Sequence, residues 1–201
     1  MGDILSIKDD AAYLRSIYIY IAISAFLFAL TAVMGYHTAQ LDPEFAASWT
    51  EELELNEILT WILEQPPLMI MMIIFLKNLL ASAMAMLLGL GLGIVPMMVA
   101  ASNGFLLGVV GYSAVEENGW LFLAAGILPH GIIELPVVLL SIAIGLRLGH
   151  LLALSLLEEK VDLSGEMRVA VHFLLRRIMP LLFLAAAIET FITPFIISRV
   201  A

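Results

Sequence analysis

Cysteine is absent from the 201 residues, which excludes disulfides and thiolate metal ligands. Any bound metal would therefore need His, Asp, Glu or Asn side chains. Charge is scarce as well: 13% of the residues are charged and 62% are hydrophobic, whereas a soluble domain has roughly 25% charged residues. Lys and Arg total 9 against 18 Asp and Glu, and the net charge of -9 argues against nucleic acid as a partner.

Long apolar runs take the place of the missing charge. A helix of about 20 apolar residues crosses the hydrocarbon core of a bilayer, which is roughly 30 Å thick. We expect about five transmembrane helices, at residues 17–35, 68–88, 97–115, 120–146 and 178–198. The predicted fold is all-α: a polytopic helical membrane protein that forms a single integral membrane domain over residues 1–201. Its first partner is the lipid bilayer.

Two segments between the predicted spans carry charge of opposite sign. Residues 37–67 hold acidic side chains and no Lys or Arg, with apolar residues at helical spacing, which predicts an acidic amphipathic segment on the outer surface. Residues 147–177 are rich in Arg, and we expect them to form a cytoplasmic helical hairpin. The positive-inside rule then places the N-terminus in the cytoplasm and the C-terminus outside a multi-pass protein of the cell (plasma) membrane.

The apolar run at residues 120–146 is long for one straight crossing. Pro129 and Pro136 each lack a backbone donor, and Gly131 lies between them. We therefore expect a broken or re-entrant segment around Pro129 and Pro136. If residues 120–129 crossed the membrane independently, the number of spans would rise to six.

Glycines recur at four-residue spacing, which is typical of helices whose backbones approach closely in a membrane. We expect these faces to pack helices together and to form a homodimer. Turns are predicted by composition at residues 89–96 and 116–119. The glycines concerned are Gly89, Gly93, Gly104, Gly108, Gly145 and Gly149.

Several polar side chains fall inside the apolar segments, near the middle of the membrane by position. Such groups are costly in lipid and usually face the interior of the helix bundle, where they pair with one another. His130 and Glu134 stand four residues apart, and a helix beginning near Gly131 would place Glu134 in its first turn, where the dipole favours a carboxylate. The predicted polar or ion site comprises His130, Glu134, Glu189, Asn78, Asn103 and Lys77.

Three hypotheses for this site stay open. In the first, the buried groups conduct or transport an ion or proton. In the second, they only hold helices together in a non-catalytic scaffold that recruits partner proteins. In the third, His130, Glu134 and Glu189 bind a metal for intramembrane hydrolysis. The third is the weakest, because the zinc-protease signature needs two His residues. No catalytic residue is assigned, and the only cofactor that the residues suggest is a bound cation.

The order of these motifs resembles the stage II sporulation protein M family of archaeal and bacterial integral membrane proteins, from about residue 10 to the C-terminus. The resemblance implies an all-helical membrane fold with five spans. In endospore-forming bacteria the namesake acts with cell-wall-remodelling partners, so the resemblance also implies membrane or cell-envelope protein partners. The residues that carry it are Asn78, Gly89, Gly93, Pro96, Asn103, Gly104, Gly108, Pro129, His130, Gly131, Glu134, Gly145, Gly149, Glu189 and Thr193.

Overall fold

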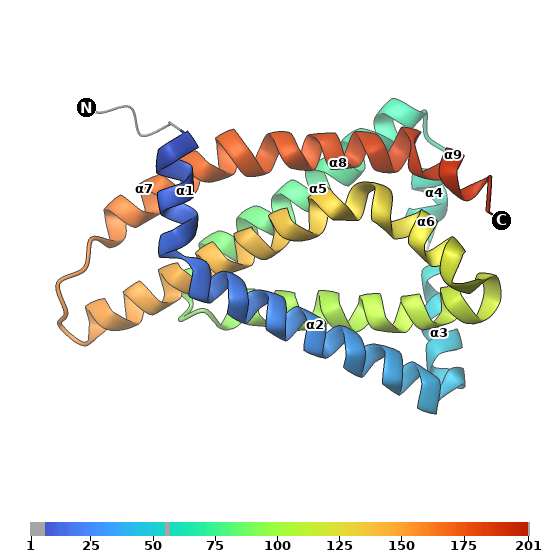
Figure 1. Ribbon diagram of the computed structural model, residues 1–201, viewed down its shortest axis with the longest axis horizontal. Helices are drawn as coiled ribbons and strands as arrows, with labels where there is room; N and C mark the ends of the chain where they lie inside the picture. Colours follow the sequence, from blue (N-terminus) through green and yellow to red (C-terminus); the bar gives the residue numbers. More distant parts are fainter. Residues whose placement is uncertain (1–6, 55–56, 201) are drawn as a thin grey trace.

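The computed structural model describes residues 7–54 and 57–200, and within these ranges the chain forms helices and no strand (Figure 1). The predicted all-α class is therefore confirmed. The elements are α1 (Ile7–Ser16), α2 (Tyr18–Leu41), α3 (Pro43–Glu54), α4 (Glu57–Leu63), α5 (Pro67–Leu87), the 3-10 turn η1 (Leu88–Leu90), α6 (Ile94–Leu156), α7 (Leu163–Phe173), the π-helical turn η2 (Leu174–Ile178), α8 (Met179–Phe191) and α9 (Thr193–Ile197).

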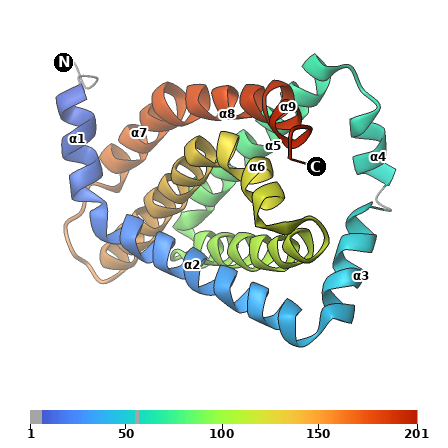
Figure 2. The same ribbon diagram turned by 45° about the vertical axis from the view of Figure 1, so that its right-hand side comes forward.

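The central element is α6, which folds back on itself at Gly119. There φ is 83° and ψ is 169°, a conformation that is open essentially only to glycine. Figures 1 and 2 show the chain reversing at this point, so α6 has a first arm (residues 94–118) and a second arm (residues 120–156). The turn predicted at residues 116–119 is confirmed.

Four stretches among the described residues are long and apolar enough to cross a membrane: Tyr18–Leu41, Pro67–Leu90, Ile94–Leu156 and Leu163–Ile197. The third contains the reversal at Gly119 and so supplies two passes. The described residues therefore form about five passes, which agrees with the number predicted from the sequence. The predicted turn after α5 is also present, because η1 and Gly93, with a φ of 77°, separate α5 from α6.

The expected break around Pro129 and Pro136 is wrong. Gly119 is the one residue of α6 with non-helical backbone angles, and the second arm bends without unwinding (Figure 1). Each proline removes one backbone hydrogen bond, but a full break would leave several more groups unsatisfied in lipid. Glu134 consequently lies within a continuous helix and not in a first turn.

Helix boundaries also differ from the prediction at both charged segments. The fourth span continues beyond residue 146 to Leu156, so the expected hairpin at residues 147–177 consists of the end of α6, a link at residues 157–162, α7 and η2. No Gly or Pro stops the second arm between His150 and Leu156. In the acidic segment, α2 extends through Leu41 and is followed by the helices α3 and α4.

The glycine faces pack helices within one chain. A Cβ atom added at Gly35, Gly104 or Gly108 would overlap the opposing backbone where α2 meets the first arm of α6. At Gly89, Gly145 and Gly149 an added Cβ would overlap backbone where η1 and the end of α5 meet the second arm. The predicted role in helix packing is confirmed, and the faces on which the homodimer prediction rested are buried inside the protein.

Replacing Gly145 with Ala should destabilise the protein, because the new methyl group would overlap the backbone of Ala85 and Met86. Overpacking of this kind costs about 1–3 kcal/mol. The measurement is the thermal or denaturant unfolding midpoint of the full chain in detergent. Gly126→Ala is the matched control on the same arm, because the nearest atom to its added Cβ is Ile197 Cδ1 at 3.9 Å. Equal midpoints for both variants would contradict close packing at Gly145.

Candidate functional site

Three ionisable side chains meet between the second arm of α6 and α8. His130 and Glu134 lie one helical turn apart on α6, and Glu189 comes from α8. One potential ligand atom from each residue lies within 4.8 Å of the other two, and all three residues are partly buried. An imidazole and two carboxyl groups at this separation can share a proton or hold a cation.

Thr193, at the start of α9, fixes the role of the His130 ring. The Thr193 hydroxyl donates to the backbone oxygen of Ile188 at 3.3 Å, so its single proton is already used. With that proton directed to Ile188, the hydroxyl oxygen is the acceptor for Nδ1 of His130, 3.4 Å away. In the neutral ring the proton then sits on Nδ1, and Nε2 keeps a free lone pair.

Helix α5 supplies two further polar groups beside Glu134. The side-chain amide of Asn78 lies within hydrogen-bonding reach of the Glu134 carboxyl group, and the charges of Lys77 and Glu189 act on that carboxyl group. The neighbouring residues on α5 differ in exposure: Asn78 is partly buried, whereas Lys77 is exposed. Because α5 packs against both α6 and α8, it closes a third side of the site.

One carboxylate oxygen of Glu134 is left without a partner. Its Oε2 atom is buried and accepts no hydrogen bond from the described residues. A buried acceptor without a partner costs about 1–3 kcal/mol, and more when it is charged. A proton or a cation bound at Oε2 would remove this cost.

The structure brings His130, Glu134 and Glu189 together, places Asn78 and Lys77 on the neighbouring α5, and leaves Asn103 apart. Asn103 lies on the first arm of α6, exposed, with its Nδ2 donating to the backbone oxygen of Val99 at 2.8 Å. Thr193 was not among the predicted site residues. Its signal was available: it follows Glu189 by four residues, the same spacing that joins His130 to Glu134.

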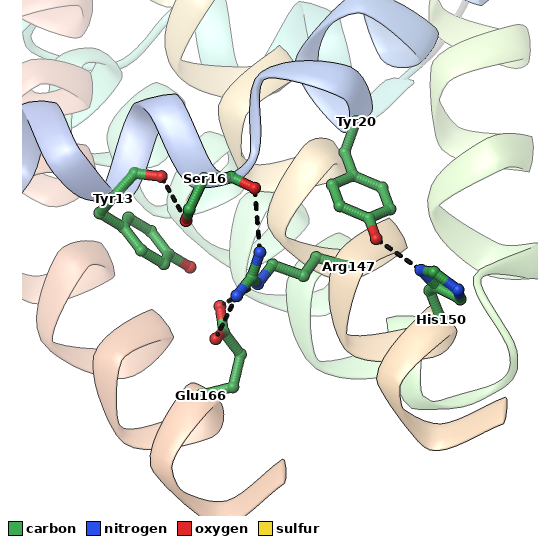
Figure 3. A network of polar contacts seen from close by, with 6 residues as sticks. All are labelled: Tyr13, Ser16, Tyr20, Arg147, His150 and Glu166. Carbon is green, nitrogen blue, oxygen red and sulfur yellow. Dashed lines mark hydrogen bonds and ion pairs between the residues drawn. The ribbon is translucent and has the colours of Figure 1, made fainter. Parts of the chain in front are cut away.

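A second polar network lies at the other end of the second arm (Figure 3). The guanidinium of Arg147 pairs with the Glu166 carboxylate of α7 (Nε to Oε1, 2.6 Å) and donates to the backbone oxygen of Ser16 at 3.0 Å. Burial, and then the Glu166 charge, raise the pKa of the Tyr13 hydroxyl, which stays neutral. Nearby, the Tyr20 hydroxyl is 2.5 Å from His150 Nδ1. The network joins α1, α6 and α7.

This network was missed by the sequence prediction, which treated Arg147 as the start of a surface segment. Arg147 follows an apolar run directly, and a charged side chain at membrane depth usually pairs with another polar group. The partner's position on α7 depends on the loop at residues 157–162. Local sequence patterns do not specify the direction in which such a loop leads the chain, and therefore do not predict where α7 packs.

Glu166→Gln should destabilise the protein by about 1–3 kcal/mol, because the charged guanidinium of Arg147 would lose its carboxylate in a largely buried position. The readout is the unfolding midpoint of the full chain in detergent. Glu159→Gln removes an equal charge from the exposed link between α6 and α7 and serves as the control. A stability loss shared by both variants would assign the effect to net charge and not to the network.

The sequence model of stage II sporulation protein M matches residues 24–194, most of the chain. The matched range contains the whole site, from Asn78 to Thr193, and both arms of α6. No curated protein and no solved structure matches the chain. The family resemblance predicted from the glycine series and from Pro129, His130 and Glu134 is confirmed.

Proposed function

We propose that this chain, which belongs to the stage II sporulation protein M family, moves an ion or proton across the membrane through its site at His130, Glu134 and Glu189. One observation carries the proposal: three ionisable side chains from two apolar helices converge to within 4.8 Å. Many large hydrophobic side chains are exposed on the helices, as expected for a membrane protein.

The free-energy cost of placing ionisable side chains inside a membrane supports a functional role for the site. Asp, Glu and His inside membrane-spanning helices are expensive, and in known membrane proteins they mark ion pathways and proton relays. Glu134 Oε2 is buried and has no hydrogen-bond partner among the described residues, so a transferred ion or proton bound there would gain a favourable contact.

The distribution of charge favours a cytoplasmic N-terminus and an external C-terminus. Arg147 reaches Ser16 of α1, and Arg177 pairs with Asp10, so α1, η2 and the end of α6 share one basic end of the bundle. The Gly119 reversal, α3 and the C-terminus lie at the opposite end (Figure 1). Under the positive-inside rule the basic end faces the cytoplasm of a cell membrane protein.

A second candidate function, a scaffold that recruits cell-envelope protein partners, is favoured by the surface of α3 and α4. Trp49 is 41% exposed and Trp61 is 50% exposed on this acidic segment. Aromatic side chains are enriched at the centres of protein interfaces. Retention of a stable partner by the Glu134→Gln variant, together with its loss on replacing Trp49 and Trp61 with Ala, would support this function.

Glu134→Gln tests the transport proposal, because it removes the charge while keeping the size of the side chain. In proteoliposomes containing the full chain we expect the flux of the transported ion or proton to fall at least about tenfold, or ~1.4 kcal/mol in the barrier. The assay compares proton flux with the fluxes of a panel of monovalent and divalent cations.

Glu117→Gln is the matched control, because Glu117 is exposed on α6 beside the Gly119 reversal. It should leave flux unchanged. The proposal fails if the wild-type protein carries neither protons nor any cation of the panel. It also fails if Glu134→Gln retains wild-type flux.

A further inference from the structure

We infer that His130, Glu134 and Glu189 form a binding site for a divalent transition-metal ion of the zinc class. The inference names the class of ion and rests on the same site as the proposed function. It is carried by the ligand set, by the hydrogen bond behind the imidazole and by the unpartnered carboxylate oxygen. Each of these is a separate feature of the described residues.

The ligand set matches the coordination preferences of zinc. Zinc commonly takes three protein ligands from imidazole and carboxylate groups and leaves a fourth position open to a water or substrate. Ligand atoms around a tetrahedral zinc lie roughly 3.4 Å apart for metal–ligand distances of about 2.1 Å. The three atoms here are within 4.8 Å of one another, a gap that rotation of the flexible Glu side chains closes.

The hydrogen bond behind His130 is the kind that metal-binding histidines make. A ligating imidazole usually donates its second ring N–H to an oxygen acceptor, which fixes the tautomer and the ring orientation. Thr193 is that acceptor here, because its own proton goes to Ile188. The Nε2 lone pair is consequently the atom available to a metal.

Charge balance favours a divalent ion over a proton alone. Glu134 and Glu189 face each other in an apolar setting, and two carboxylates so placed repel unless something positive lies between them. Lys77 offers one positive charge, but it is exposed. A divalent ion would neutralise both carboxylates and give Glu134 Oε2 a partner. The imidazole favours zinc-class ions over Ca²⁺ and Mg²⁺, which prefer shells of oxygen ligands.

The test is direct binding of Zn²⁺ and Co²⁺ to the full chain in detergent, after stripping with a chelator. Competition with a chromophoric chelator gives the stoichiometry and Kd for Zn²⁺, and the visible absorption of Co²⁺ reports its coordination geometry. We expect about one ion per chain, with low coordination number and mixed N/O ligands. His130→Ala and Glu134→Gln should each weaken binding by at least about 100-fold.

Thr193 provides a variant that leaves all three ligands in place. Thr193→Val keeps the shape of the side chain but removes the acceptor for His130, and should weaken metal binding by about 10–100-fold. Thr193→Ser keeps the hydroxyl group and should bind like the wild type. The control is the double variant His172→Ala and Glu117→Gln, which removes one exposed His and one exposed Glu outside the site. It should bind metal like the wild type. Circular dichroism and size-exclusion profiles verify that each variant is folded.

Absence of stoichiometric Zn²⁺ and Co²⁺ binding by the wild type overturns the inference, as does binding that survives both His130→Ala and Glu134→Gln. The flux assay separates this failure from failure of the proposed function. Proton flux through a chain that binds no metal would keep the proposed function and overturn the metal site. Stoichiometric metal binding without any ion flux would keep the metal site and overturn the proposed function.

Discussion

Close backbone contact between helices at glycine is the constraint on which the site depends. Gly89 and Gly145 leave no room for a Cβ atom where α5 ends against the second arm of α6, and Gly149 meets Gly93 one turn further on. In lipid, the association of helices relies on such packing, because the tails are as apolar as the side chains. The contact sets the distance between α5 and α6, and thereby brings Asn78 beside Glu134.

Polar interactions are concentrated at two places along the second arm of α6, and their chemistry differs. At Arg147 the guanidinium pairs with a carboxylate and donates to a backbone carbonyl, so its charge is balanced and the network acts as a structural joint. At Glu134 one oxygen has no partner among the described residues, and a second carboxyl group lies close by. Charge balance distinguishes the joint from the site, since Arg147 faces one carboxylate, whereas two carboxyl groups meet at Glu134 and Glu189.

Hydrophobic length, charge and glycine spacing predicted the class, the approximate pass count and the packing faces, because these depend on local composition. The reversal at Gly119 was predictable for the same reason. The behaviour of Pro129 and Pro136 was not, because a proline can bend or end a helix according to what packs around it. The pairing of Arg147 with Glu166 and of His130 with Thr193 depends on how segments that are distant in the sequence fold back against the second arm of α6. Only the spacing of Glu189 and Thr193 hinted at the second pair.

Continuity of the second arm changes how the site must work. With Glu134 inside an unbroken helix, the second arm of α6 offers no helix terminus to an ion at this point. On that arm the ion or proton must be held by side chains. Two of these are fixed on one helix, whereas Glu189 lies on α8, which is bounded by the π-helical turn η2 and by the irregular Ile192. Interruptions of this kind are frequent at functional sites, and the geometry of the site depends on the position of α8.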